Sequence, residues 1–305
     1  MDEVVPASLA GQRLDRVVAM VTGASRAEVA DLISAGAVTV DGQVVTTRSH
    51  RLAEGNRVQA DVAQLPPAGG PPVVADADVD VQVVFADDDL IVVDKPADLV
   101  VHPGAGNYEG TLVHGLLARF PEIATVGDPT RPGIVHRLDK GTSGLLLVAR
   151  SPEAYTRLVA LLAAHDVERR YLALVWGEFA VLNGMVDAPI GRSAREPTRM
   201  TVSAKGKPAR TRYEVVATYR DPLTLSLVEC RLETGRTHQI RVHLTAIDHP
   251  VVGDQRYGGA RSSFPFPRPW LHAVALRLRH PVTGEELAFD SPLPDDLRES
   301  LERLG

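Results

Sequence analysis

The chain has 305 residues, of which 44% are hydrophobic and 24% charged, and this length and composition can form one large globular domain and a smaller one. Its formal net charge of -6 at pH 7 excludes nucleic-acid binding through overall charge alone, although a local basic patch can still hold phosphates. The single cysteine, Cys230, excludes an internal disulfide, and because we find neither a signal-peptide pattern nor an apolar run of about 18 residues, we expect a cytoplasmic protein without a membrane span.

Residues 8–63 predict a small domain of two helices and a short β-ribbon. Apolar residues recur at helical spacing across 14–21. A Ser-x-x-Glu capping box at 25–28 begins a second helix, which should end at Gly36. The Asp41-Gly42 pair between two valine-rich segments is typical of a hairpin turn.

The segment from Ser25 to Gly42, with its Leu-Ile-x-x-Gly-x-Val-x-Val-Asp-Gly ending, resembles the S4 RNA-binding domain. The resemblance implies that this small domain binds RNA. Because the domain is not basic overall, one face would have to make the contact, and Arg26, Arg48 and Arg51 are the candidates. A protein-binding or purely structural role is the alternative.

Residues 64–78 predict a linker between the small domain and a larger one at 79–305. The segment contains four prolines and two glycines, and its proline pairs make it semi-rigid. In the larger domain, Leu90–Lys95 predicts a short buried strand that stops at a proline. Residues 112–119 and 154–165 predict helices.

Nucleotide-binding motifs are not supported. Gly104-x-Gly106 lacks a correctly placed third glycine, and no acidic residue ends a strand about 20 residues later. The phosphate-loop pattern Gly-x-x-x-x-Gly-Lys-Ser/Thr does not occur. We therefore expect no nucleotide cofactor.

A charged loop at 136–144 precedes the apolar run 145–150, which is typical of a strand buried on both faces. In an extended loop, Arg137 and Asp139 would point to one side and Leu138 to the core. This arrangement would place the Asp139 carboxylate at the mouth of a sheet. Alternatively, Asp139 is a loop carboxylate paired with a neighbouring cation, without a catalytic duty.

Two further segments carry candidate site residues. Residues 169–175 predict a strand on which Tyr171 is either core or part of a site. If residues 238–243 are also extended, their two histidines point to opposite faces, so a shared metal is not expected. The same alternation places Arg241 on a polar face, where it could pair with Asp139.

The segment 189–211 predicts a long polar loop rich in positive charge. Between 192 and 212 the chain has seven Arg or Lys residues against one Glu. A loop of this length in a compact domain is usually functional or disordered, and its charge suits phosphates. The candidate RNA-binding residues here are Arg192, Arg199, Lys205 and Lys207. A solvated basic loop without a partner is the alternative.

The run His-Arg-Leu-Asp-Lys-Gly-Thr-Ser-Gly-Leu at 136–145 resembles the signature of the RluA-type pseudouridine synthases. The segments at 169–175 and 232–243 resemble two further motifs of that family, and the glycine-rich run at 102–107 is most similar to its D branch, which acts on ribosomal RNA. The resemblance implies an α+β fold built on a mixed, largely antiparallel sheet.

The family resemblance also implies roles for individual residues. Asp139 would be the catalytic carboxylate and Arg241 its partner. Tyr171 would stack on the target base, and Arg137 would fill the gap left by the flipped nucleotide.

The implied activity is the isomerisation of uridine to pseudouridine in the helix 69 stem-loop of 23S ribosomal RNA. The partner would be 23S rRNA or a pre-50S particle, and we expect a monomer with no cofactor and no metal. Two alternatives stay open: a synthase that acts on tRNA, and a non-catalytic RNA-binding or ribosome-assembly factor.

Overall fold

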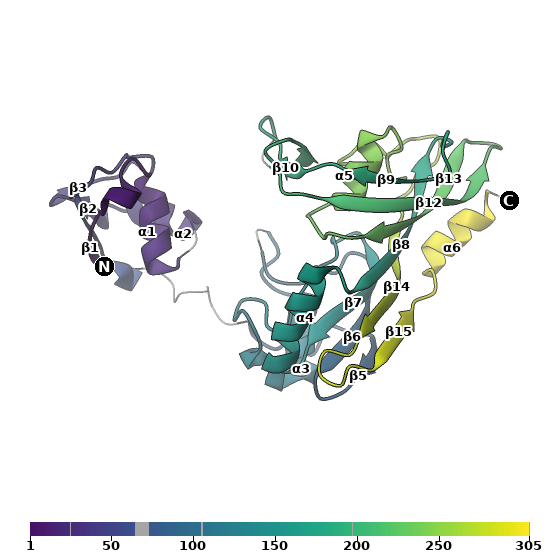
Figure 1. Cartoon of the computed structure of the whole chain (residues 1–305), viewed down its shortest axis with the longest axis horizontal. Coiled ribbons are helices and arrows are strands. Elements are labelled where there is room, and N and C mark those ends of the chain that lie inside the picture. The colour runs from purple at the N-terminus through teal and green to yellow at the C-terminus, as the bar shows by residue number, and fades with distance from the viewer. Residues whose placement is uncertain (25, 65–72, 105, 197, 305) are drawn as a thin grey trace. The chain divides into compact units, whose positions relative to one another are not determined.

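The computed structural model describes residues 1–24, 26–64, 73–104, 106–196 and 198–304, without the side chains of 26, 27 and 64. The chain divides into two compact units, Met1–Val73 and Val74–Gly305 (Figure 1). Most of the predicted linker lies outside the described residues.

In the smaller unit, two helices pack against an antiparallel sheet with the strand order β1-β4-β2-β3. The elements are β1 (Asp2–Val4), η1 (Ala7–Leu9), α1 (Leu14–Thr22), α2 (Arg26–Ser34), β2 (Val38–Val40), β3 (Gln43–Val44), β4 (Arg57–Ala60) and η2 (Val62–Gln64). Both predicted helices and the hairpin are confirmed. The hairpin turn has positive φ at Asp41 and at Gly42, as a two-residue turn of this kind requires. The predicted cap residue Ser25 lies outside the described residues.

In the described part of the larger unit, nine strands form one sheet with the order β5-β6-β7-β14-β8-β13-β12-β9, and β15 pairs with β14 (Figure 1). The strands are β5 (Val83–Ala86), β6 (Leu90–Lys95), β7 (Ser143–Ala149), β8 (Glu168–Trp176), β9 (Asn183–Asp187), β12 (Arg210–Tyr219), β13 (Leu225–Leu232), β14 (Leu271–Arg279) and β15 (Glu286–Asp290). Among these described strands only β7 and β14 pair in parallel, so the predicted α+β fold with a largely antiparallel sheet is confirmed.

The helices of the larger unit are α3 (Leu112–Arg119), η3 (Pro121–Thr125), α4 (Pro152–Ala164), α5 (Gln239–Ala246) and α6 (Asp295–Glu302). The structure confirms the helices predicted at 112–119 and 154–165 and the buried strand at 90–95. Over the described residues, none of the helices is both long and apolar enough to cross a membrane.

The central strand β7 is buried along its whole length, as its apolar run predicts. It begins where the charged loop ends, at a close approach to β14. Gly144 has φ 108°, and a Cβ there would lie 2.3 Å from the carbonyl oxygen of Ala273. Glycine at this position therefore lets the loop that carries Asp139 enter the sheet.

Most of the segment 238–243 is helical, so the extended conformation that we expected for it was wrong. Helix α5 begins directly after His238, which has φ 57°. The Gln239 side chain accepts hydrogen bonds from the backbone N–H of Arg236 and from the hydroxyl of Thr234. These bonds stabilise a turn that starts the helix, a tertiary arrangement that strand alternation does not describe.

The expectation of a structureless loop at 189–211 was also wrong. Strands β10 (Ile190–Arg192) and β11 (Met200–Val202) pair as an antiparallel ribbon. The reason is local burial, because Ile190 and Ala209 are almost fully buried and pack in a small cluster with Val242 of α5. We call residues 190–207 the basic ribbon.

Candidate active site

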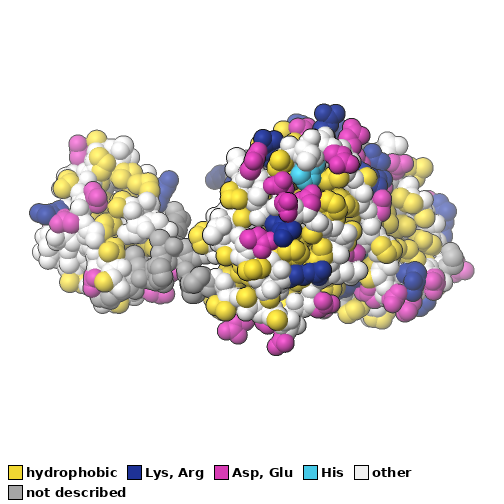
Figure 2. All heavy atoms as spheres, turned by 90° about the horizontal axis from the view of Figure 1, so that it is seen from below, with side chains coloured by type: hydrophobic (Ala, Val, Ile, Leu, Met, Phe, Trp, Pro, Cys, Tyr) yellow, Lys and Arg dark blue, Asp and Glu magenta, His cyan; other side chains and the backbone are white. Residues whose placement is uncertain are grey.

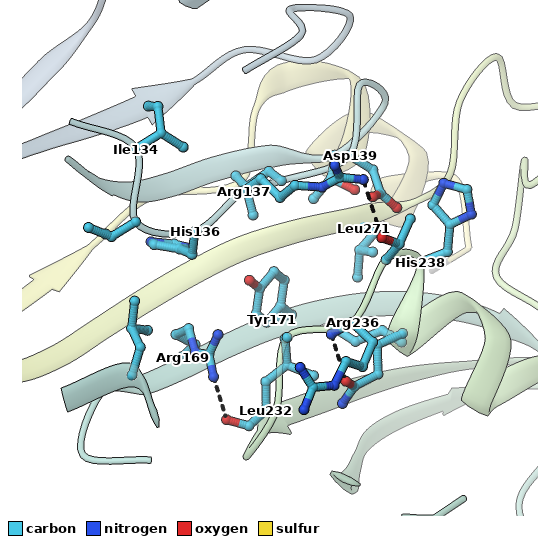
Figure 3. A pocket seen from close by; sticks show the side chains of 18 of the residues that line it. Ile134, His136, Arg137, Asp139, Arg169, Tyr171, Leu232, Arg236, His238 and Leu271 are labelled. Atoms are coloured by element: carbon cyan, nitrogen blue, oxygen red, sulfur yellow. Dashed lines mark hydrogen bonds between the residues drawn. The ribbon is translucent and has the colours of Figure 1, made fainter. Parts of the chain in front are cut away.

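A pocket of about 360 Å³ lies among the charged loop, β8 and the turn that precedes α5 (Figure 3). Asp139, Arg137, Tyr171 and Arg241 all line it. Within the described part of the chain, the lining contains five arginines and one carboxylate, Asp139. A pocket with this charge suits an anionic, oxygen-rich ligand such as RNA.

The side chain of Lys95 holds the charged loop in place. It has no exposed surface, which is rare for a lysine. Its ammonium donates to the carbonyl oxygens of Pro96 at 2.7 Å, Leu99 at 2.8 Å and Lys140 at 3.3 Å. Burial lowers the pKa of Lys95 to about 7. Leu138 is buried, Arg137 is exposed and Asp139 is half-buried, so the loop presents Asp139 to the pocket.

Arg241 bridges two carboxylates. Its Nη1 lies 2.9 Å from Asp139 Oδ2, while its Nε and Nη2 lie 2.6 and 2.9 Å from the two carboxylate oxygens of Asp254. Asp254 has no exposed surface and also accepts the backbone N–H groups of Arg256 and Tyr257. Burial lowers the pKa of Arg241, but the bonds to Asp254 and Asp139 outweigh it and raise the pKa above its usual range. Arg241 is therefore a fixed cation that holds the Asp139 carboxylate.

Tyr171 lies on β8, where its neighbours across the sheet are Cys230 on β13 and Ala273 on β14. Only 5% of its surface is exposed, and that part faces the pocket. Burial raises the pKa of Tyr171 to about 12, so the phenol is neutral at physiological pH. Its position on a rigid strand suits a flat partner that enters the pocket.

Arg137 extends over the pocket from the loop. Its Nη2 lies 3.4 Å from the hydroxyl of Thr237, a long contact that leaves the guanidinium exposed to solvent. Figure 3 shows Arg137 and Asp139 on the same side of the pocket, with His238 beyond them.

Sequence reasoning assigned no role to Asp254. The residue lies in the turn before Tyr257, and the Tyr257 hydroxyl is 2.8 Å from His238 Nδ1. The signal available was an aspartate that follows the apolar pair Val251-Val252 after a single glycine, which is an unusual place for a charge. Two other residues of the pocket, His136 and Arg169, were also given no role.

The basic ribbon contacts the site through Tyr257. The guanidinium carbons of Arg199 and Arg241 lie 5.1 and 5.0 Å from the centre of the Tyr257 ring, and the Tyr257 hydroxyl accepts the backbone N–H of Met200. The ribbon's candidate residues Arg192, Lys205 and Lys207 are exposed.

The RNA-binding candidates Arg26 and Arg48 belong to the smaller unit. Arg48 is exposed on that unit, and the side chain of Arg26 lies outside the described residues. On the face of the larger unit seen in Figure 2, basic and acidic side chains are interspersed. Over the described residues, no group of three His, Cys, Asp or Glu could hold a metal ion.

Comparisons with known proteins find the same family for the larger unit and an RNA-binding domain model for the smaller one. The family model for RNA pseudouridylate synthase matches residues 89–246, and the S4 domain model matches residues 12–58. The chain is 43% identical to ribosomal large subunit pseudouridine synthase D of Vibrio vulnificus, covering 100% of this chain and 94% of that protein. It is 40% identical to the uncharacterized RNA pseudouridine synthase YlyB of Bacillus subtilis, covering 96% and 94%. The solved structure of human RNA pseudouridylate synthase domain containing 1 matches with a TM-score of 0.58 and 31% identity, covering 73% of this chain and 88% of that one.

Proposed function

The chain belongs to the RNA pseudouridine synthase family of isomerases, which convert uridine to pseudouridine in RNA, and we propose that it modifies the helix 69 stem-loop of 23S ribosomal RNA with Asp139 as the catalytic carboxylate. One observation carries the proposal. Asp139 lines a pocket of about 360 Å³ and is held there by Arg241, which is itself fixed by the buried Asp254.

The chemistry needs a carboxylate that reaches the sugar and the base at the same time. The N1–C1′ bond of uridine breaks, the base turns, and C5 bonds to C1′. A carboxylate at the pocket mouth can reach C1′ and C6, and the ion pair with Arg241 both orients it and compensates its charge. Electrostatic compensation of this kind is available before the substrate binds, so it requires no rearrangement during the reaction.

The target uridine has to leave its stem or loop to reach Asp139. Tyr171 offers the exposed part of its ring to the base, a contact that RNA-binding proteins use widely. Arg137 is exposed next to Asp139, where its side chain can enter the gap left by the flipped nucleotide.

Regions away from the pocket would supply affinity. We assign RNA binding to the S4 domain at 8–63, followed by the linker at 64–78 and the catalytic domain at 79–305. The remaining candidate contacts are Arg26, Arg48, Arg192, Arg199, Lys205 and Lys207. We expect a cytoplasmic monomer whose partner is 23S rRNA or a pre-50S particle.

Mapping pseudouridine along ribosomal RNA and tRNA tests the proposal. Cells that lack this gene are compared with cells that carry the wild type or Asp139→Asn, using primer extension after carbodiimide treatment. We expect the stops in the helix 69 loop to disappear and to return only with the wild type. Purified Asp139→Asn should bind the stem-loop within a few-fold of the wild type while making no product.

Asp166→Asn is the matched control, because it makes the same change at an exposed carboxylate that does not line the pocket. This variant should restore every stop. Substantial turnover by Asp139→Asn would overturn the catalytic assignment, and stops lost in a tRNA instead would overturn the substrate assignment.

A further inference from the structure

Arg169 is a buried arginine whose hydrogen-bonding groups are mostly unused. It lies on β8 two residues before Tyr171, is 5% exposed and lines the same pocket. Within the described part of the chain its Nε has no hydrogen-bond partner. Its Nη2 reaches the carbonyl oxygens of Leu232 and Glu233 only at 3.5 Å, the outer limit for a hydrogen bond.

Burying an arginine with so few hydrogen bonds costs free energy in the protein without a ligand. A buried guanidinium without full hydrogen bonding loses hydration that nothing replaces, and burial accordingly lowers the pKa of Arg169. The other pocket arginine with a buried guanidinium, Arg241, has two carboxylates. We therefore infer that Arg169 receives its partner from outside the chain.

His136 adds a second donor at the same end of the pocket. Its Nε2 accepts the backbone N–H of Leu147 at 2.9 Å, so the proton of the neutral ring must be on Nδ1. Burial lowers the pKa of His136 to about 3, so the ring is neutral at physiological pH. Figure 3 shows Tyr171 between Asp139 on one side and Arg169 with His136 on the other.

The ligand that fits these donors is a carbonyl oxygen of the target base. A phosphate belongs to the backbone of a polymer and stays at the pocket mouth, whereas the flipped base is the group that enters past Asp139. Uracil has two carbonyl oxygens, and a base lying on Tyr171 would direct an edge toward Arg169.

We propose that Arg169 donates a hydrogen bond to a carbonyl oxygen of the target uracil and holds the base after it separates from the sugar. The inference rests on the proposed function, because it requires the uridine to occupy the Asp139 pocket. When the N1–C1′ bond breaks, the electron pair stays with the base, and the negative charge spreads over N1 and the carbonyl oxygens. As the C5–C1′ bond forms, C5 loses its proton and N1 gains one. A fixed cation binds the detached anion more strongly than the neutral base, so it both stabilises and retains it.

A double-mutant cycle between the enzyme and the base tests the contact. The substrate is an RNA that the wild type modifies, prepared with uridine, 2-thiouridine or 4-thiouridine at the target, because sulfur accepts hydrogen bonds less well than oxygen. Single-turnover rates are measured for the full-length wild type, Arg169→Met and Arg169→Lys. We expect Arg169→Met to be roughly 10- to 100-fold slower on uridine with RNA affinity within a few-fold. We also expect one thio-substitution to slow the wild type several times more than it slows Arg169→Met.

Comparison within the cycle removes the intrinsic effect of sulfur on the reactivity of the base, since that effect is common to both enzymes. Arg169→Lys keeps the cation and should recover part of the rate. Arg170→Gln is the matched control: the next residue on β8 forms ion pairs with Glu168 and Glu229, does not line the pocket, and should behave as wild type in every arm.

The possible failures can be told apart. If neither thio-substitution shows coupling to Arg169→Met while the wild type turns over normally, Arg169 does not contact the base and the inference is wrong. Coupling to a methylphosphonate next to the target, instead of to a thiocarbonyl, would identify a phosphate partner and would also overturn it. If the wild type modifies no uridine in helix 69 RNA, the proposed substrate fails, and the cycle is run on the RNA that the mapping identifies.

Discussion

The pocket and the basic ribbon are both rich in arginine and lysine, but they hold these charges in different ways. In the pocket, Arg241 has two fixed carboxylate partners. On the ribbon, Lys205 and Lys207 are exposed to solvent. Buried charges depend on the exact positions of their partners, so the loss of one partner group has a large effect. Exposed charges attract phosphates in proportion to their number, and salt screens this attraction. Function should therefore be divided between chemistry in the pocket and affinity on the ribbon.

The largest effect is expected at Asp254, which has no exposed surface and two bonds to Arg241. Asp254→Ala leaves the buried guanidinium of Arg241 with Asp139 as its remaining carboxylate partner. The free energy of unfolding should fall by about 3–5 kcal/mol, the usual result of breaking a buried ion pair, and turnover should fall with it. Urea unfolding followed by tryptophan fluorescence reports on the larger unit, because both tryptophans, Trp176 and Trp270, lie there.

Asp139→Asn is the comparison for that measurement. The Asp139 side chain is 17% exposed and its amide replacement can still accept from Arg241, so this variant should lose much less stability while losing all turnover. Equal losses of stability in the two variants would show that Asp254 has no special role in holding Arg241.

A second prediction concerns acid stability and His136, whose pKa burial lowers to about 3 from a usual 6.5. Below pH 6.5 the unfolded chain binds a proton that the folded chain does not. The free energy of unfolding should therefore fall as the pH falls from 6.5 to 3, by at most about 1.4 kcal/mol per pH unit from this group. Above pH 6.5 the ring is neutral in both states and contributes no slope.

The His136→Gln variant isolates that contribution, because glutamine can accept the same backbone N–H of Leu147 without titrating. The difference in unfolding free energy between the wild type and the variant should change with pH below 6.5 and be constant above it. A constant difference from pH 4 to pH 8 would contradict the prediction.

Tyr257→Phe should produce an intermediate effect at the junction of the two regions. The ring next to Arg199 and Arg241 remains, but the hydroxyl that bonds to the Met200 N–H and to His238 Nδ1 is lost. We expect a loss of about 1–2 kcal/mol in the free energy of unfolding, and a turnover lowered by less than about tenfold. Both are measured as for Asp254→Ala. A turnover loss as large as that of Asp254→Ala would show that the ribbon and the pocket do not act separately.

Local patterns predicted much of the frame of the larger unit. Residues 90–95 and 112–119 have the bounds predicted for a buried strand and a helix, because an apolar run ended by a proline and a helical apolar period are both local signals. The hairpin at Asp41-Gly42 was predicted for the same reason, since the two residues determine the turn that joins them.

The predictions failed where distant residues decide the structure. The pairing of Arg241 with Asp139 was expected from strand alternation, and the ion pair is present, but α5 is a helix whose first turn depends on Gln239 and Thr234. The local sequence shows only that Asp254 follows an apolar pair, and the fold alone shows that this carboxylate is buried against an arginine. Strand pairing of the basic ribbon needs the buried Ile190, a contact that charge counting does not include.

The smallest effects are expected on the ribbon, from Lys205→Gln and Lys207→Gln. Each removes one exposed cation, so the affinity for RNA should fall only a few-fold and single-turnover rates at saturation should not change. If each lysine meets one phosphate, the slope of log affinity against log salt should become shallower by about 0.7 per lysine. Filter binding at several salt concentrations measures this slope.

Arg220→Gln is the matched control for the lysine variants, because it makes the same change in net charge outside the ribbon, next to Glu178. An equal shift of the salt slope in this control would mean that overall charge, and not the ribbon, sets the affinity. A fall in the saturating rate of either lysine variant would instead place that lysine in the chemistry of the pocket. Unchanged rates with a shallower salt slope for the Lys205 and Lys207 variants alone would support the division between chemistry in the pocket and affinity on the ribbon. Exposed cations next to phosphates bind the RNA equally well before and during the reaction, so they do not accelerate it.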